Sequence, residues 1–210
     1  MSNILIFGDS IAHGYWDCQG GWVVRLRKYI DQIILSKDPN YWCEIYECGV
    51  SGDTTKELLN RFERELKVRI WDEKPIIVLA IGINDSIYFE HKKANKVAID
   101  DFKNNLEKLY KIALKYSEQI IFLGLTPVDE SKITPMSWSL TQFVYEENVE
   151  KYNQIIKKFC QKYKLQYTDL MTEFKKQNYK KLLHDGLHPN DRGHELIYKI
   201  VLENLKSLIS

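Results

Sequence analysis

The segment PIIVLAIGIND, residues 75–85, decides how this chain folds. Its central run, IIVLAIG, carries no polar side chain, so both faces of the expected strand are apolar. A strand that is apolar on both faces is typical of a parallel sheet with helices packed on each side. The proline before the run and the Asn-Asp pair after it indicate where the strand begins and ends. The segment therefore predicts an α/β protein with a central parallel sheet.

The chain on either side of this segment repeats the same pattern. Short apolar runs alternate with longer stretches in which apolar residues recur at helical spacing. We expect about five strands, at residues 4–7, 43–48, 76–82, 120–125 and 165–168. We expect helices between and after them, at residues 22–35, 54–68, 102–116, 148–163 and 191–208. No internal repeat or linker interrupts the alternation, which predicts a single domain over residues 1–210.

The composition is that of an ordinary globular protein. The chain has 210 residues, of which 44% are apolar and 28% charged, and its formal net charge is +1. This near-neutral charge gives no general preference for nucleic acid or an anionic membrane. The densest charged stretch, residues 61–69, alternates Arg with Glu and is interpreted as a solvated helix face. No apolar run approaches the roughly 20 residues that span a bilayer, and no signal peptide is recognised, so we expect a cytoplasmic protein.

The four cysteines do not form a metal or redox motif. None of them makes a C-x-x-C pair, which argues against a zinc-ribbon or thioredoxin-like site. We expect all four to be reduced and structural. They are Cys18, Cys43, Cys48 and Cys160.

Small and polar residues follow the expected strands. These turns read GDS at 8–10, GVSGDT at 49–54, GIND at 82–85 and TPVDES at 126–131. In an open parallel sheet, ligands bind beyond the carboxyl ends of the strands. We therefore expect the functional site at this edge, with the long irregular stretch 126–140 bordering a pocket.

A nucleophile and a base are available among these turns. Ser10 directly follows the first strand, and a serine hydroxyl attacks only when a base removes its proton. His188 lies three residues after Asp185, so the two side chains share one side of a turn or short helix. Asp185 can then hold one imidazole nitrogen and leave the other free for the Ser10 proton. Taken alone, each motif has a simpler interpretation as a helix cap.

An ester hydrolase also needs donors for the negative charge that develops on the carbonyl oxygen. Gly52 offers a backbone N–H in a glycine-rich turn, and Asn84 offers a side-chain amide. The backbone N–H of Ser10 is a third candidate. The simpler alternatives are that Gly52 makes a turn and that Asn84 with Asp85 caps a helix.

Together these blocks resemble the SGNH hydrolases, also called the GDSL esterase/lipase family. The matching blocks are GDS at 8–10, GVSGDT at 49–54, GIND at 82–85 and DGLHP at 185–189. The resemblance implies a three-layer α/β/α sandwich related to flavodoxin. It also implies Ser10 as nucleophile, His188 as base and Asp185 as its partner, with Gly52 and Asn84 as oxyanion donors.

The chain departs from the family pattern at two places. The first block reads GDSI rather than GDSL, and the position two before Gly49, often Asn in relatives, is Glu47 here. Asp9 and Asp85 are similar to the family, and we expect them to hold their loops by hydrogen bonds rather than to react.

The resemblance implies a serine esterase that hydrolyses small acyl esters or thioesters, including acetyl groups on carbohydrates, through an acyl-enzyme intermediate. No metal or cofactor is required, and the expected partner is a small-molecule ester. His13, Tyr15 and Trp138 are expected to line the substrate pocket. Trp16 and Trp22 are assigned to the core, which is also the open alternative for Trp138. Exposed residues of the stretch 138–145 could serve self-association as a homo-oligomer.

Two other functions remain open from the sequence. A metal-dependent phosphohydrolase would use His184, Asp185, His188 and Asp85, although the chain offers few further ligands at that edge. A non-catalytic, flavodoxin-like binding module would have the same fold. The sequence contains neither GxGxxG nor a P-loop lysine that would favour nucleotide binding.

Overall fold

A five-stranded parallel sheet forms the centre of the protein in a computed structural model that describes residues 3–36, 42–70 and 73–209. Its strand order is β2-β1-β3-β6-β8, and every neighbouring pair is parallel. The strands are β1 (Ile4–Gly8), β2 (Ile45–Gly49), β3 (Ile76–Ala80), β6 (Ile120–Leu123) and β8 (Gln166–Thr168). The α/β fold and the parallel sheet are therefore confirmed. The predicted domain range also includes residues 1–2, 37–41, 71–72 and 210, which lie outside the described residues.

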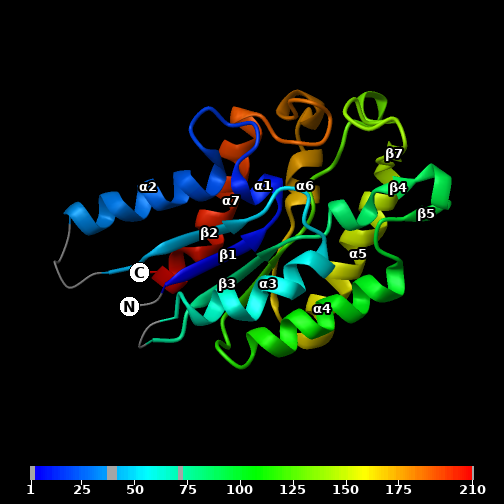
Figure 1. Ribbon diagram of the computed structural model, residues 1–210. Coiled ribbons are helices and arrows are strands. Elements are labelled where there is room, and N and C mark those ends of the chain that lie inside the picture. Colours follow the sequence, from blue (N-terminus) through cyan, green and yellow to red (C-terminus); the bar gives the residue numbers. More distant parts are fainter. Residues whose placement is uncertain (1–2, 37–41, 71–72, 210) are drawn as a thin grey trace.

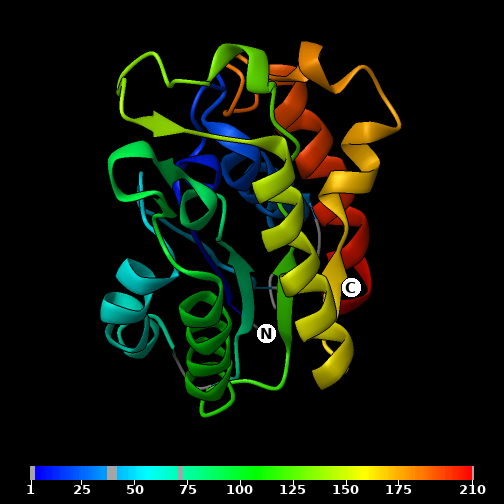
Figure 2. The same ribbon diagram turned by 90° about the vertical axis from the view of Figure 1, so that its right-hand side faces the viewer.

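Helices cover both faces of this sheet, as Figure 1 and Figure 2 show. One face packs against α3 (Thr55–Lys67), α4 (Ile99–Ala113) and α5 (Glu146–Tyr163). The other packs against α2 (Gly21–Ser36), α6 (Leu170–Lys175) and α7 (Asp191–Ile209). Side chains of a strand point alternately to the two faces, so Ile77 and Leu79 enter one core and Ile76 and Val78 the other. This arrangement explains why β3 had to be apolar on both faces.

The predicted helices and strands agree with the structure to within a few residues, but several short elements were not predicted. The helix expected at 102–116 lies at Ile99–Ala113, and the strand expected from residue 43 begins at Ile45. The six-residue helix α6 was not predicted. Among the described residues, no helix is long and apolar enough to cross a membrane.

A second, smaller sheet was also not predicted. Its three antiparallel strands have the order β5-β4-β7 and contain two residues each. They are β4 (Tyr88–Phe89), β5 (Ala94–Asn95) and β7 (Gln142–Phe143). Strands this short show no periodicity in the sequence. Strand β7 ends the irregular stretch that follows β6 and ties it to the chain after β3 (Figure 1).

The end of β1 is packed so tightly that it accepts only glycine. A Cβ on Gly8 would lie 2.5 Å from the Ala80 carbonyl oxygen and 2.6 Å from the Ala12 Cβ. Contacts this short do not occur between a real Cβ and its neighbours, so a side chain here would push β1 away from β3. Gly8 thus allows β1 to lie close both to β3 and to the segment that follows β1.

Arg61 of α3 ties together the ends of two strands. Its guanidinium donates hydrogen bonds to the carbonyl oxygens of Gly8 and Cys48, and to the carboxylates of Asp53 and Glu65. Its side chain is only 18% exposed. The interpretation of residues 61–69 as a solvated face is therefore wrong for Arg61, because this side chain points toward the sheet edge rather than into solvent.

Candidate active site

Ser10 is the first residue of the short helix α1 (Ser10–His13), immediately after β1. The preceding Asp9 caps this helix, and its carboxylate accepts a hydrogen bond from the Ile11 N–H at 2.9 Å. Ser10 is buried, and its Oγ lies 2.9 Å from Nε2 of His188. The structure thus brings together two side chains from opposite ends of the sequence.

His188 is held by Asp185. The ring Nδ1 lies 2.7 Å from Oδ2 of Asp185. The other carboxylate oxygen, Oδ1, accepts the backbone N–H groups of Leu187 and His188 at 2.9 and 2.8 Å. A carboxylate beside Nδ1 keeps the proton on that nitrogen, which leaves Nε2 to accept a hydrogen bond from the Ser10 hydroxyl. Burial alone would raise the pKa of Asp185, but the hydrogen bonds from the His188 ring and from the backbone hold that pKa well below its usual range.

Backbone hydrogen bonds close the loop that carries both residues. The Asn190 N–H donates to the Leu182 carbonyl oxygen, and the His184 N–H donates to the His188 carbonyl oxygen, both at 2.8 Å. The Asp129 N–H donates to the Gly186 carbonyl oxygen at 2.7 Å, which joins this loop to the chain after β6. The imidazole and carboxylate are therefore presented on a fixed segment.

Gly52 and Asn84 lie in the same cavity as Ser10. Gly52 has φ +82°, a left-handed conformation that favours glycine, and no atom lies within 4 Å of the place where a Cβ would stand. Asn84 is buried, and its Nδ2 donates to the Asp53 carbonyl oxygen at 3.0 Å. This bond uses one of the two amide N–H groups, so the other is free to donate into the cavity.

Asp9 and Asp85 support the loops around the site, as expected. The Asp85 carboxylate accepts hydrogen bonds from the backbone N–H and the hydroxyl of Thr55, the first residue of α3. Burial raises the pKa of Asp9 to about 6, against the hydrogen bond from Ile11. Burial likewise raises the pKa of Asp85 to about 7, against the hydrogen bonds from Thr55. Neither carboxyl lines the cavity.

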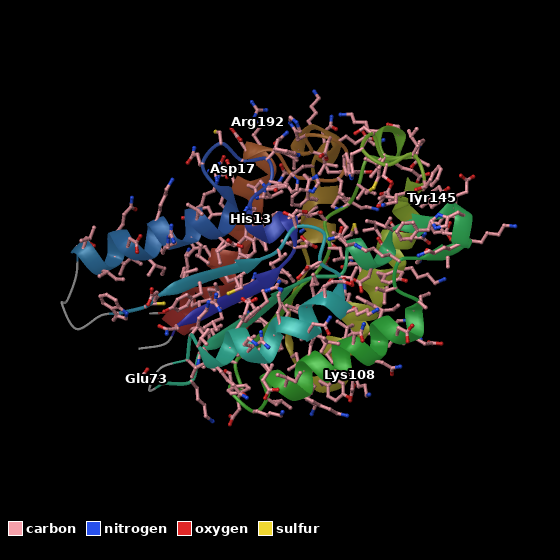
Figure 3. All side chains as sticks on the ribbon, viewed as in Figure 1. His13, Asp17, Glu73, Lys108, Tyr145 and Arg192 are labelled. Atoms are coloured by element: carbon pink, nitrogen blue, oxygen red, sulfur yellow. The ribbon has the colours of Figure 1, made fainter. Side chains whose placement is uncertain are left out.

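The cavity has a volume of about 460 Å³ and is partly walled by aromatic rings. Tyr15, Trp16 and Trp138 line it, with ring centroids 6.0, 6.4 and 6.0 Å from that of His188. His13, labelled in Figure 3, is not part of the lining. Its Nδ1 instead lies 3.4 Å from a carboxylate oxygen of Glu47 on β2. Of the three pocket residues expected from the sequence, the structure places Tyr15 and Trp138 at the cavity and His13 outside it.

Trp16 is a site residue that the sequence interpretation missed. The assignment of Trp16 to the core is wrong, because its side chain is 51% exposed. Its indole Nε1–H donates to Oδ2 of Asp185 at 3.0 Å, the same oxygen that accepts from the His188 ring. The only sequence signal was an aromatic residue shortly after the GDS block, which does not specify a partner 169 positions away.

His194 of α7 fixes the segment that carries Tyr15 and Trp16. It is fully buried, and its Nε2 donates to the Tyr15 carbonyl oxygen at 2.7 Å. Burial lowers the pKa of His194, which favours the neutral ring in this position. His194 falls within the helix expected at residues 191–208, and its tethering role has no sequence signature.

The residues suggested for a metal-dependent phosphohydrolase do not gather as ligands. Among the residues that the structure describes, one group of three or more His, Cys, Asp or Glu side chains has its ligand atoms within 4.8 Å of one another. That group is Asp17, Cys18 and Asp191, and it includes none of His184, Asp185, His188 and Asp85. The exposed His184 instead lies beside Trp16, with ring centroids 5.8 Å apart.

Comparisons with a family model and with solved structures found similar proteins. A family model described as the GDSL-like lipase/acylhydrolase family matches residues 6–196. Among solved structures, a lipase/acylhydrolase from Enterococcus faecalis is similar, with a TM-score of 0.78 and 22% identity, covering 99% of this chain and 96% of that one. No curated protein matches the sequence.

Two further solved structures share the fold. A member of the lipolytic G-D-S-L family from Veillonella parvula has a TM-score of 0.73 and 20% identity, covering 98% of this chain and 99% of that one. Axe2, an acetylxylan esterase from Geobacillus stearothermophilus, has a TM-score of 0.71 and 21% identity, covering 97% of this chain and 94% of that one.

Proposed function

Because the chain belongs to the GDSL-like lipase/acylhydrolase family, and is therefore a serine ester hydrolase, we propose that Ser10, His188 and Asp185 carry its reaction. The observation that supports this proposal most directly is the pair of hydrogen bonds from Ser10 to His188 and from His188 to Asp185, at 2.9 and 2.7 Å. A hydroxyl, an imidazole and a carboxylate in this order can move a proton away from the attacking oxygen.

In the acylation step, Oγ of Ser10 attacks the carbonyl carbon of the ester. Its proton passes to Nε2 of His188, and the imidazolium that forms is stabilised by the Asp185 carboxylate. His188 then gives this proton to the leaving alcohol or thiol, and the acyl group remains on Ser10. In the second step a water molecule loses a proton to His188 and attacks the acyl group. His188 then gives this proton to Oγ of Ser10 as the acid leaves, which restores both residues.

The negative charge of each tetrahedral intermediate lies on the former carbonyl oxygen. The backbone N–H groups of Ser10 and Gly52 and the second amide N–H of Asn84 are the donors proposed for it. A donor that is already oriented contributes more than one that must reorient during the reaction. The bond from Asn84 to Asp53 and the left-handed turn at Gly52 supply that orientation.

The proposed substrates are small acyl esters, with acetyl groups on carbohydrates as the favoured class. The cavity volume of about 460 Å³ is within the range for small-molecule sites. Tyr15, Trp16 and Trp138 offer flat, amphipathic faces against which a sugar ring can stack. The similarity to an acetylxylan esterase supports the same class.

A fluorophosphonate probe tests the assignment of the nucleophile. We expect intact-mass analysis to show a single adduct and peptide mapping to place it on Ser10. The His188→Ala variant should remain unlabelled, whereas His184→Ala, which changes an exposed histidine of the same loop, should label normally. An adduct on another residue, or a folded wild-type protein that stays unlabelled, would contradict the proposal.

A comparison of substrates tests the proposed substrate class. We expect kcat/KM to be higher for acetylated xylooligosaccharides than for a p-nitrophenyl ester of a long-chain acid. The variant Trp138→Ala should raise KM for the acetylated sugar more than for p-nitrophenyl acetate. Equal effects on both esters would argue against a sugar ring stacked on this residue.

A further inference from the structure

A second cavity lies beside the proposed active site, between α3 and α4. The two helices run next to each other on one face of the sheet, as Figure 1 and Figure 2 show. The cavity has a volume of about 740 Å³, enough for a small-molecule ligand. We call it the lysine groove because its charged lining consists of Lys56, Lys96, Lys108, Lys111, Lys115 and Asp101.

Part of this positive charge is balanced by acidic side chains, and Asp101 belongs to the lining itself. Lys111 and Lys115 approach Glu107 and Glu63 at 3.7 and 3.4 Å. The side chains of Lys56 and Lys108 form no ion pair or hydrogen bond with any residue that the structure describes. Figure 3 labels Lys108 on α4. Like charges gathered in one groove repel one another, and a bound anion would relieve that repulsion.

Lys96 connects the lysine groove to the proposed active site. It lines both cavities, and its Nζ donates to the Gly52 carbonyl oxygen at 2.9 Å. Gly52 is one of the proposed oxyanion donors. A ligand whose ester carbonyl lies at Ser10 can therefore extend past Lys96 into the groove without leaving the surface.

We propose that the lysine groove binds the anionic end of an acyl ester whose carbonyl reacts at Ser10. This proposal rests on the proposed function and deepens it, because it adds negative charge to the substrate. The shared ligand chemistry is two or more phosphate or carboxylate groups on the part of the molecule that remains after acyl transfer. A phosphate-bearing thiol ester and an acetylated acidic oligosaccharide both have that chemistry.

The test compares charged and neutral esters on matched charge-reversal variants. The groove variant is Lys56→Glu/Lys108→Glu. The control variant is Lys151→Glu/Lys158→Glu, which changes two exposed lysines of α5 and alters the net charge equally. The substrates are p-nitrophenyl acetate, acetyl-coenzyme A and an acetylated oligogalacturonate.

We expect the groove variant to raise KM about tenfold for an anionic ester, in line with the modest strength of exposed charge pairs acting together. The control variant should leave that KM nearly unchanged, and neither variant should change kcat/KM for p-nitrophenyl acetate. The anionic ester whose KM rises in the groove variant shows whether the ligand is a phosphate-bearing thiol ester or an acidic oligosaccharide. Equal KM values in the two variants for both anionic esters would overturn the proposal.

A binding measurement separates this proposal from the proposed reaction. Calorimetric titration of Ser10→Ala protein with inorganic tripolyphosphate should show binding that added salt weakens. The same titration after Lys56→Glu/Lys108→Glu should show at least a tenfold loss of affinity. If Ser10→Ala protein with all its groove lysines does not bind tripolyphosphate, the proposal that the lysine groove binds anions is wrong. If tripolyphosphate binds but the wild-type protein hydrolyses none of the esters, the result counts against the proposed function alone.

Discussion

At the scale of single residues, the proposed oxyanion site depends on one amide that does two tasks. Asn84 uses one N–H to hold the Asp53 carbonyl oxygen and has the other available for substrate. The hydrogen bond to Asp53 fixes the direction in which the second N–H of Asn84 points. This is the kind of prior orientation that makes a hydrogen-bond donor effective in a transition state.

Removing this amide should reduce turnover far more than binding. We expect Asn84→Ala to lower kcat by about 10²–10³-fold with little change in KM, because the donor acts mainly on the developing oxyanion. Steady-state kinetics with p-nitrophenyl acetate measure this split. The exposed Asn104→Ala on α4 is the control, and an unchanged kcat in Asn84→Ala would remove this residue from the proposed oxyanion site.

Trp16 is the second residue whose effect can be isolated. The Trp16→Phe variant keeps an aromatic ring but removes the N–H that donates to Asp185. We expect kcat to fall about fivefold, which corresponds to about 1 kcal/mol for a half-exposed hydrogen bond. The exposed Trp42→Phe serves as the control. A rise in KM with kcat unchanged would mean that Trp16 contacts substrate and does not position Asp185.

Some residues of the candidate site could be proposed from the sequence and others could not, for a physical reason. The GDS and DGLHP blocks are local patterns, so Ser10, Asp185 and His188 could be proposed as site residues without coordinates. Trp16 and His194 act through contacts with residues far away in the chain, at Asp185 and Tyr15. Those contacts depend on how the segment after α1 folds against α7, and no local pattern encodes them.

At the scale of secondary-structure elements, α3 holds the sheet edge that carries the site. Arg61 reaches from this helix to the carbonyl oxygens at the ends of β1 and β2. Ser10 follows β1 and Gly52 follows β2, so one guanidinium fixes the starting points of both turns. A guanidinium has enough N–H donors to satisfy two carbonyls and two carboxylates together, whereas an ammonium has one donor too few.

Shortening this side chain should therefore loosen both turns. We expect Arg61→Lys to lower the free energy of unfolding by about 1–3 kcal/mol, because buried hydrogen bonds to carbonyl and carboxylate groups are lost. Urea unfolding measures the change, and kcat should fall in the same variant. Arg64→Lys, on the exposed side of the same helix, should change neither quantity. Equal stability of the two variants would contradict the role given to Arg61.

Element prediction succeeded where periodicity was strong and failed where it was absent. The five long helices and the buried strands carry apolar residues at regular spacing, and their positions were predicted to within a few residues. The strands β4, β5 and β7 have two residues each, and α6 has six. Such short elements form because of tertiary contacts, not because of their own sequence.

At the scale of the whole molecule, buried carboxyl groups should make stability depend on pH. The pKa of Asp9 is raised to about 6 and that of Asp85 to about 7. In the unfolded chain both groups ionise near their ordinary value of 3.8. The folded protein therefore binds more protons than the unfolded chain between these values. The contribution of these two carboxyl groups to stability is therefore greatest below about pH 4 and is lost as pH rises through 6 and 7.

The variant Asp9→Asn should remove part of this dependence, since asparagine resembles the protonated acid and keeps an oxygen for the Ile11 N–H. We expect the wild type to lose about 2–3 kcal/mol more stability than the variant between pH 4 and pH 8. Urea unfolding at several pH values measures this difference. The exposed Asp31→Asn should follow the wild type, and an identical pH slope in Asp9→Asn would show that Asp9 is not the group responsible.

The hydrogen bond between Ser10 and His188 joins positions 178 residues apart. During synthesis, β1 leaves the ribosome first, although it lies between β2 and β3 in the finished sheet. The loop that carries His188 and Asp185 leaves only after all five strands have been made. A growing chain therefore has the proposed nucleophile but not its proposed base. In the proposed mechanism, ester cleavage begins only when translation has passed residue 188, so a shorter nascent chain does not cleave esters.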